Sequence, residues 1–343
     1  MSELIIVWEK APATRITTTA IKVAAERFES AKLALQIYDD ATLLYRYLPV
    51  PSLLTGVCLR ALASGDCDTA LNLLPSIVPH SVHLLISIHR CAAQTGNMTL
   101  FDLANSQLSK KFSPEEMDKF LPWKLYTLAR AGKTSEILNI LSSPKGHLVQ
   151  HQQLKQISAL LFASPDEVDA AYFYLERIFQ QNTSAASDLL YAFDFIIVSC
   201  GIIKDFSRAS ETFEILPTFN LKPQISTFNS LLYACWKTNS ITVVPEIYQA
   251  INDSCLSPTA ETYEYLAKIF LESETLPAVV EVIKKATEAG IVLLYSVYEG
   301  AIKALVTAGK TSHAQTIIDQ MKSLSVDYLF MQQYISNFPT ARY

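Results

Sequence analysis

The feature that most constrains the fold of this chain is a set of apolar residues that recurs every 35 positions. One aromatic column contains Phe193, Phe228, Tyr263 and Tyr298. Six further columns keep the same stride over four units, and they begin at Ile196, Ile197, Cys200, Ala209, Phe213 and Leu216. Within each unit the columns fall at i, i+3, i+4 and i+7, which is the spacing of one helix face. Several columns with one stride indicate a repeat architecture.

Each 35-residue unit contains two apolar stripes separated by a short polar break. The breaks lie at 204–205, 238–240, 272–274 and 308–311. This pattern predicts two antiparallel helices joined by a turn. Gly309 and Asn239 suit the left-handed conformation that ends a helix. Pro245 lies deeper in its helix than a first-turn proline, so we expect a kink or a late helix start there.

The same alternation continues upstream with looser spacing. Turn centres fall near 65, 96, 132, 167, 204, 239, 274 and 309. Such hairpins cannot bury an apolar face alone, so the sequence predicts an all-α solenoid, an α-α superhelix of about eight helix-turn-helix repeats. The expected divisions are an opening segment with a first helix (1–50), degenerate hairpins (51–189), four regular repeats (190–329) and a tail (330–343).

Composition excludes several classes of protein. Half of the 343 residues are hydrophobic and only 9 are glycine, which excludes a disordered chain. The longest apolar stretch, 189–203, is interrupted by Asp194, so no membrane span is expected. The formal net charge is −5, so nucleic-acid binding would need a local basic patch. Six scattered cysteines without a C-x-x-C pair suit a reducing compartment or buried positions better than a disulfide framework.

Two loop-and-helix segments carry a resemblance to a known family. Pro223 is followed by Phe228 and Asn229 at the start of a helix, and Pro258 with Tyr263 repeats the arrangement. This pattern resembles the pentatricopeptide-repeat family. The tetratricopeptide family has a similar hairpin of 34 residues, but the strict stride of 35 and the loop prolines favour the first family. The resemblance is firm for 190–329 and general for 17–189.

The resemblance implies that a base is read by the residue after the start aromatic together with the last residue of the repeat. Mapped by spacing, the pairs are Asp194 with Gln224, Asn229 with Thr259, Glu264 with Leu294, and Glu299 with Leu329. Only Asn229 with Thr259 comes near the family preference, and leucine cannot hydrogen-bond to a base edge. The candidate RNA-contacting residues are Asp194, Gln224, Asn229 and Thr259. Between 204 and 322 there are 10 basic and 13 acidic residues, which does not suit a polyphosphate.

The sequence contains no candidate catalytic, cofactor-binding or metal-binding set, so we expect a protein that is not an enzyme. Gly-Lys-Thr occurs at 132–134 and 309–311, but a phosphate-binding loop needs a glycine five residues earlier, where Thr127 and Ala304 stand. Three histidines and a cysteine lie within 80–91. They lack the spacing of a zinc site, and packing between helices explains them equally well.

These observations favour a non-catalytic binding or scaffold protein. The resemblance implies a component of an organellar ribonucleoprotein such as the mitochondrial ribosome, acting in organelle gene expression, with proteins of a larger assembly as partners and structured or single-stranded RNA as a further partner. One alternative is a sequence-specific RNA-binding factor for mitochondrial mRNA stability or translation. Another is a cytosolic tetratricopeptide-like adaptor between proteins. The expected location is therefore mitochondrial, with cytoplasmic as the alternative.

Overall fold

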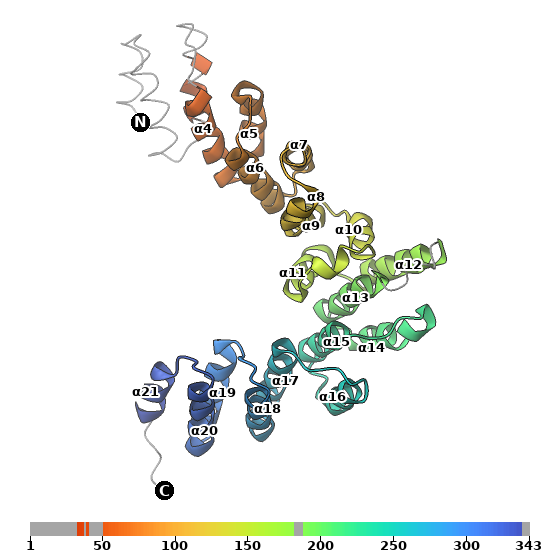
Figure 1. Cartoon of the computed structure of the whole chain (residues 1–343), viewed down its shortest axis with the longest axis vertical. Helices are drawn as coiled ribbons and strands as arrows, with labels where there is room; N and C mark the ends of the chain where they lie inside the picture. The colour runs from red at the N-terminus through yellow and green to blue at the C-terminus, as the bar shows by residue number, and fades with distance from the viewer. Residues whose placement is uncertain (1–32, 38, 41–50, 182–187, 338–343) are drawn as a thin grey trace. The chain divides into compact units, whose positions relative to one another are not determined.

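The computed structural model describes residues 33–37, 39–40, 51–181 and 188–337, and among these residues every regular element is helical (Figure 1). The α-helices are α4 (Pro51–Ser64), α5 (Cys67–Leu73), α6 (Val82–Thr95), α7 (Met98–Leu108), α8 (Pro114–Met117), α9 (Leu121–Arg130), α10 (Thr134–Leu141), α11 (His151–Leu161), α12 (Pro165–Gln181), α13 (Leu190–Ile202), α14 (Phe206–Glu214), α15 (Ile225–Thr238), α16 (Val244–Asp253), α17 (Ala260–Glu272), α18 (Leu276–Glu288), α19 (Tyr295–Thr307), α20 (Thr311–Ser323) and α21 (Leu329–Asn337). Short 3-10 helices occur at Leu74–Ile77, Asp118–Phe120, Gly146–Leu148, Leu216–Phe219 and Ile241–Val243. The opening helix expected within 1–50 lies outside the described residues, apart from 33–37 and 39–40.

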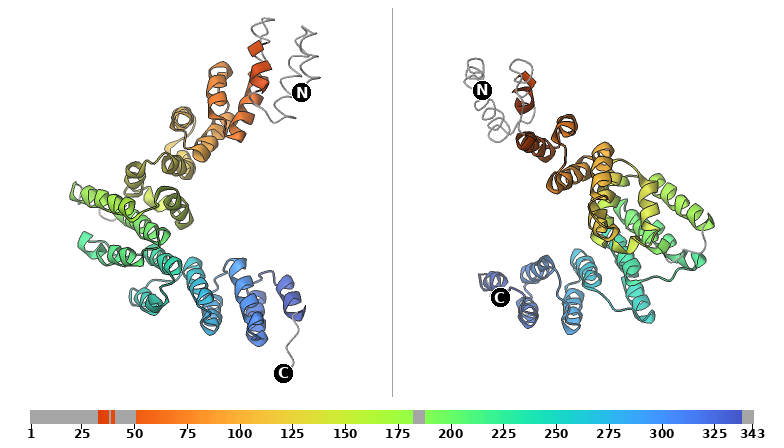
Figure 2. Two further views of the ribbon diagram at one scale, coloured as in Figure 1. Left: turned by 180° about the vertical axis from the view of Figure 1, so that it is seen from behind. Right: turned by 45° about the horizontal axis from the view of Figure 1, so that its top comes forward.

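Consecutive helices form pairs joined by short turns, and the described part of the chain contains eight such pairs before α21. The chain divides into two compact units, Met1–Ile137 and Leu138–Tyr343. In the second unit, α17 packs on α19 and α18 on α20, as the blue helices of Figure 2 show. The all-α solenoid of helical hairpins predicted from the sequence is therefore confirmed. No helix of the described residues is long and apolar enough to span a bilayer.

The predicted turn centres are sites of left-handed backbone. Positive φ angles occur at seven of the eight centres, which are Gly65, Gly96, Gly132, Lys204, Asn239, Glu274 and Gly309. The remaining turn lies at 162–164 rather than near 167, because Pro165 begins α12. A second set of positive φ angles follows the second helix of each regular repeat, at Asn220, Cys255, Gly290 and Ser325. The backbone therefore repeats every 35 residues at both ends of a hairpin.

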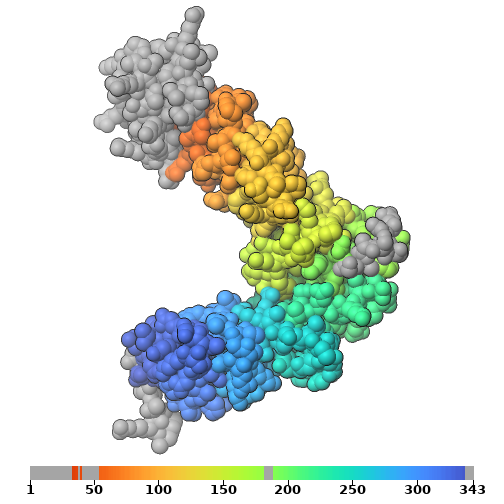
Figure 3. All heavy atoms as spheres, viewed as in Figure 1, coloured from red at the N-terminus to blue at the C-terminus, as the bar shows by residue number. Residues whose placement is uncertain are grey.

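The apolar columns form the core between successive pairs. Leu216, Ile251, Ala286 and Met321, which share one column, have no exposed surface. The start aromatics are also buried, with at most 6% of their surface exposed at Tyr263. The packed atoms of these repeats are the green to blue part of Figure 3. The late start predicted at Pro245 is confirmed, because a 3-10 turn precedes α16 and places this proline in its first turn.

Close packing of first helices brings the functional candidates together. Gly201 of α13 lies so near α15 that an added Cβ atom would meet the Ala234 Cα and Tyr233 Cδ1 atoms at 3.0 Å. A glycine permits this approach because it has no side chain. The resulting contact between α13 and α15 places Asp194 and Ser226 within hydrogen-bond distance.

Candidate functional site

The best-matching candidate pair, Asn229 and Thr259, is brought together by the repeat. The Asn229 Nδ2 atom donates to the Thr259 Oγ1 atom at 3.2 Å, and the Thr262 Oγ1 atom donates to Asn229 Oδ1 at 2.7 Å. Asn229 is 3% exposed, and Thr259 also caps the first turn of α17. The amide that would meet a base edge is therefore held within the protein by two hydroxyl groups.

The second candidate pair, Asp194 and Gln224, has no bond between its members in the described contacts. Asp194 of α13 is buried, and its Oδ2 atom accepts a hydrogen bond from Ser226 Oγ at 2.7 Å, whereas Oδ1 has no partner among the described residues. Burial raises the pKa of this carboxyl to about 6, against the smaller opposing effects of Ser226 and Thr227. Gln224 is exposed at the start of α15.

The carboxylates at the equivalent positions of later repeats are engaged within the protein. The backbone N–H of Leu294 donates to Glu264 Oε1 at 3.0 Å. The Glu299 carboxylate lies 2.6 Å from the Lys303 ammonium group, one helical turn away. Each of these carboxylates therefore interacts with another group of the protein and not only with solvent.

A polar network on α11, which the sequence did not predict, reaches two other helices. The His151 Nδ1 atom lies 2.7 Å from Glu261 Oε1 on α17, and its Nε2 atom lies 3.1 Å from Ser230 Oγ on α15. Lys155 Nζ donates to Tyr265 Oη at 2.6 Å and lies 3.3 Å from Glu261 Oε1. Burial alone would raise the pKa of Glu261, but the bonds and charges of His151 and Lys155 hold it at about 2. We call these five residues the α11 network.

The α11 network shares Lys155 and Tyr265 with a cluster of three aromatic rings and three lysines. The aromatic–lysine cluster consists of Tyr233, Trp236, Tyr265, Lys155, Lys237 and Lys268. The rings of Tyr233, Trp236 and Tyr265 have mutual centroid distances of 5.8 to 6.2 Å. Lys237 lies 4.1 Å and Lys268 5.2 Å from the Trp236 ring centroid. Tyr233 and Tyr265 are buried, with 3% and 1% of their surface exposed, so Trp236 is the ring of this cluster that solvent reaches.

The histidines and cysteine at 80–91 have separate structural environments. His80 is buried with its ring nitrogens near Gln107 Oε1 and the Leu74 carbonyl oxygen. His89 packs against Phe101, and neither of its ring nitrogens has a hydrogen-bond partner in the part of the chain that the structure describes. Burial lowers the pKa of His89 to about 4, so its imidazole is neutral at physiological pH. In the part of the chain that the structure describes, no three such side chains gather as metal ligands would.

Comparison with known proteins finds a similarity to one curated pentatricopeptide-repeat protein over part of the chain. No family model matches the chain. A mitochondrial pentatricopeptide repeat-containing protein of Arabidopsis thaliana is 29% identical over 126 residues, which is 36% of this chain and 20% of that protein. The aligned part is thus a fifth of the relative.

The solved structures that the chain matches include pentatricopeptide repeat proteins. The maize protein PPR10 has a TM-score of 0.46 at 14% identity, covering 96% of this chain and 53% of that one. PPR10 with an 18-nucleotide psaJ RNA element scores 0.46 at 13% identity, with 96% and 46% coverage. The pentatricopeptide-repeat domain of Arabidopsis thaliana protein-only RNase P 1, solved with tRNA, scores 0.43 at 14% identity and covers 58% of this chain and all of that domain.

The observations that identify the class are the 35-residue stride, the helical hairpins and the relative from Arabidopsis thaliana. The stride recurs in the apolar columns and in the left-handed turns at both ends of a hairpin. Together these features show a helical-repeat protein that is similar to pentatricopeptide-repeat proteins.

Proposed function

We propose that the chain is a non-catalytic binding and scaffold protein of a mitochondrial ribonucleoprotein such as the ribosome, where it acts in organelle gene expression. The observation that carries this proposal is that the polar side-chain atoms of Asn229 and Thr259 are hydrogen-bonded to one another and to Thr262. Reading a base there would require breaking buried hydrogen bonds, each worth about 1 kcal/mol net. The mitochondrial setting follows the name of the Arabidopsis relative. Protein contacts then supply most of the affinity.

Affinity purification from native mitochondrial extract, with and without ribonuclease, tests the scaffold function. We expect the same set of partner proteins to be retained after RNA digestion, because the contacts are between proteins. The control is a known RNA-tethered protein purified in parallel, which must lose its partners. Loss of the whole partner set from the present chain would contradict the scaffold function.

A second candidate function is binding of single-stranded RNA without pairwise base reading. The observation that favours it is the aromatic–lysine cluster, where Lys237 and Lys268 flank the partly exposed Trp236 ring, while the Tyr233 and Tyr265 rings are buried. Stacking on aromatic side chains contributes about 1–3 kcal/mol per base and tolerates any sequence. In this candidate function the bases contact Trp236 and the phosphates contact Lys237 and Lys268.

A double charge reversal, Lys237→Glu with Lys268→Glu, tests RNA binding at this cluster. We expect affinity for random single-stranded RNA of about 20 nucleotides to fall roughly tenfold. The salt dependence of binding should also weaken, because the variant makes fewer phosphate contacts and its binding therefore releases fewer counterions. Fluorescence anisotropy at several salt concentrations measures both. Lys284→Glu with Lys285→Glu on α18 is the matched control, since it makes the same change of charge at two exposed lysines outside the cluster. Equal losses in both variants would mean that bulk charge alone attracts RNA.

A further inference from the structure

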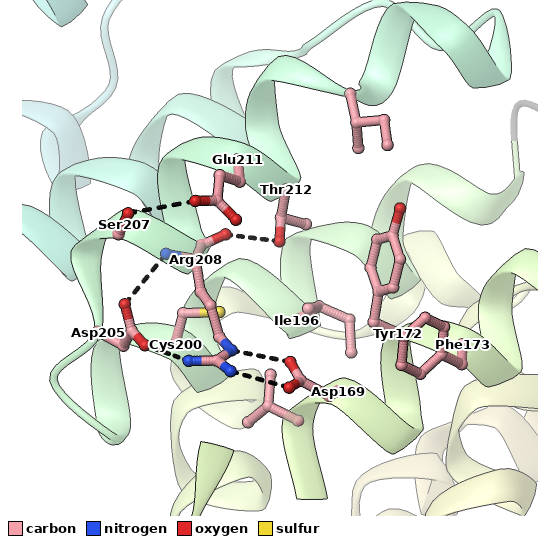
Figure 4. Close-up of a pocket in the computed structure, with 12 residues that line it drawn as sticks. Asp169, Tyr172, Phe173, Ile196, Cys200, Asp205, Ser207, Arg208, Glu211 and Thr212 are labelled. Atoms are coloured by element: carbon pink, nitrogen blue, oxygen red, sulfur yellow. Dashed lines mark hydrogen bonds and ion pairs between the residues drawn. The ribbon is translucent and has the colours of Figure 1, made fainter. Parts of the chain in front are cut away.

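A second surface of the unit Leu138–Tyr343 contains a pocket between α12, α13 and α14. Its volume is about 500 Å³, and Figure 4 shows the side chains around it. Tyr172 and Phe173 of α12 form an aromatic side, and Asp169, Arg208 and Glu211 lie across from these rings. The Phe173 ring is 63% exposed, which is unusual for so large an apolar side chain. The pocket therefore combines an exposed ring with charged groups.

Arg208, the cationic residue that lines the pocket, forms ion pairs with two carboxylates. Arg208 donates from Nε and Nη2 to the two Asp169 oxygens, each at 2.8 Å, and from Nη1 to Asp205 at 2.5 Å. Arg208 lowers the pKa of both carboxyl groups, through side-chain hydrogen bonds at Asp169 and chiefly through its backbone N–H at Asp205. Both carboxylates are therefore ionised at neutral pH. A guanidinium group held by two carboxylates does not attract an anion.

The charge of the surrounding helices is strongly acidic. Together α12 and α14 carry six acidic residues and two arginines. Their net charge is thus −4, within a chain whose formal net charge is −5. Within the pocket, Glu211 is exposed. Among the described contacts, its carboxylate accepts a hydrogen bond only from the neutral Ser207 hydroxyl. A local negative field of this kind attracts basic segments and repels phosphate.

We propose that this pocket docks a basic segment of a protein partner, with one arginine or lysine side chain inserted. The aliphatic stem of that side chain packs along the Tyr172 and Phe173 rings, and its cationic head lies near the Glu211 carboxylate, since both Asp169 oxygens are already bonded to Arg208. Long basic side chains combine an apolar stem with a charged head, and cations are attracted to aromatic faces. This inference rests on the proposed scaffold function, for which it supplies a docking site and the chemistry of the partner.

The test uses the full-length chain and a fluorescent twelve-residue peptide of alternating arginine and leucine. Glu211→Lys and Phe173→Ala each change an exposed pocket residue. We expect each to weaken peptide binding about tenfold in anisotropy titrations. The matched control for charge is Glu214→Lys, because Glu214 lies on the same helix, is exposed, and accepts a hydrogen bond from Ser210 as Glu211 does from Ser207. The matched control for apolar area is Phe330→Ala on α21, whose ring is 60% exposed.

The outcomes separate this inference from the proposed function. Tenfold losses in the two pocket variants, with affinities within twofold of the parent in the two controls, support the pocket. Equal weakening by Glu211→Lys and Glu214→Lys overturns it, since general charge attraction then explains binding. If the pocket variants bind normally while the partner set survives ribonuclease, the pocket fails and the scaffold function stands. If ribonuclease removes the partner proteins while the pocket variants still bind the peptide about tenfold more weakly than the controls, the scaffold function fails and the pocket stands.

Discussion

Replacing Asp194 with asparagine is expected to stabilise the protein near neutral pH by about 3 kcal/mol. The carboxyl is 1% exposed, its Oδ1 atom lacks a partner, and burial raises its pKa from 3.8 to about 6. A difference of about two pKa units corresponds to roughly 3 kcal/mol between the two protonation states. The ionised carboxylate therefore costs the native state this amount at neutral pH, and asparagine removes the charge while keeping an oxygen for Ser226.

The sign of the pH dependence follows from the direction of this shift. Because the folded-state pKa is the higher one, the stabilising contribution of the protonated carboxyl is complete below pH 3.8 and is lost as the pH rises through about 6. The gain from Asp194→Asn should thus be largest near pH 7 and nearly absent at about pH 4. Calorimetric melting of the full chain should show an upward shift of roughly 5–10 °C near neutral pH.

Asp253→Asn is the control for this experiment, since Asp253 is exposed on α16 and bonds only to Gln249 in the described contacts. Its effect should stay within about 0.5 kcal/mol at both pH values. An unchanged or lowered melting temperature for Asp194→Asn near pH 7 would show that the ionised carboxylate is stabilised by its surroundings.

Replacing Glu261 with glutamine is expected to destabilise the protein by about 2 kcal/mol. Glu261 is the common partner of His151 and Lys155, whose side chains are 8% and 17% exposed. Removing its charge leaves the Lys155 ammonium group partly buried without a counter-charge, which is costly in a desolvated site. The figure is below that of a fully buried pair, because the Glu261 side chain is 31% exposed.

Urea denaturation near pH 7 measures this loss, with Glu288→Gln as the control. Glu288 is 64% exposed and lies 3.9 Å from Lys284, so its loss should cost less than about 0.5 kcal/mol. Lys155→Met should also be milder in the Glu261→Gln background than alone, since the two groups are coupled. The folded-state pKa of Glu261 is about 2, below 4.5, so its contribution is present above pH 4.5 and lost as the pH falls toward 2. Equal stability of parent and variant near pH 7 would rule out a stabilising role for the α11 network.

The fold was predictable because the apolar positions that form the core recur in every repeat. Each column supplies several independent copies of the same evidence, and polar breaks separate the helices. Seven turn centres were placed correctly: five are glycine or asparagine, which tolerate positive φ, whereas Lys204 and Glu274 lie in polar breaks of the 35-residue stride. The turn near 167 was misplaced because the first repeats lack the fixed stride, and Pro165 begins the helix earlier than the spacing indicated.

The candidate site was less predictable, because its contacts are not repeated. The repeat spacing correctly paired Asn229 with Thr259, which lie in contact. It could not predict the hydrogen bond between their side chains, because that bond depends on the rotamers. His151 and Glu261 are 110 residues apart, and no periodic signal relates them. The pocket beside Phe173 likewise depends on how α12 and α14 diverge over α13, which an apolar column does not encode.

The α11 network has a consequence for how the unit Leu138–Tyr343 unfolds. In an ordinary solenoid each repeat interacts with its neighbours only, so that unravelling can proceed stepwise from either end. Here His151 bonds to side chains of both α15 and α17, so a single helix is tied to two later repeats. Loss of α11 therefore costs bonds in both at once, and this stretch of the array is expected to melt as one cooperative block.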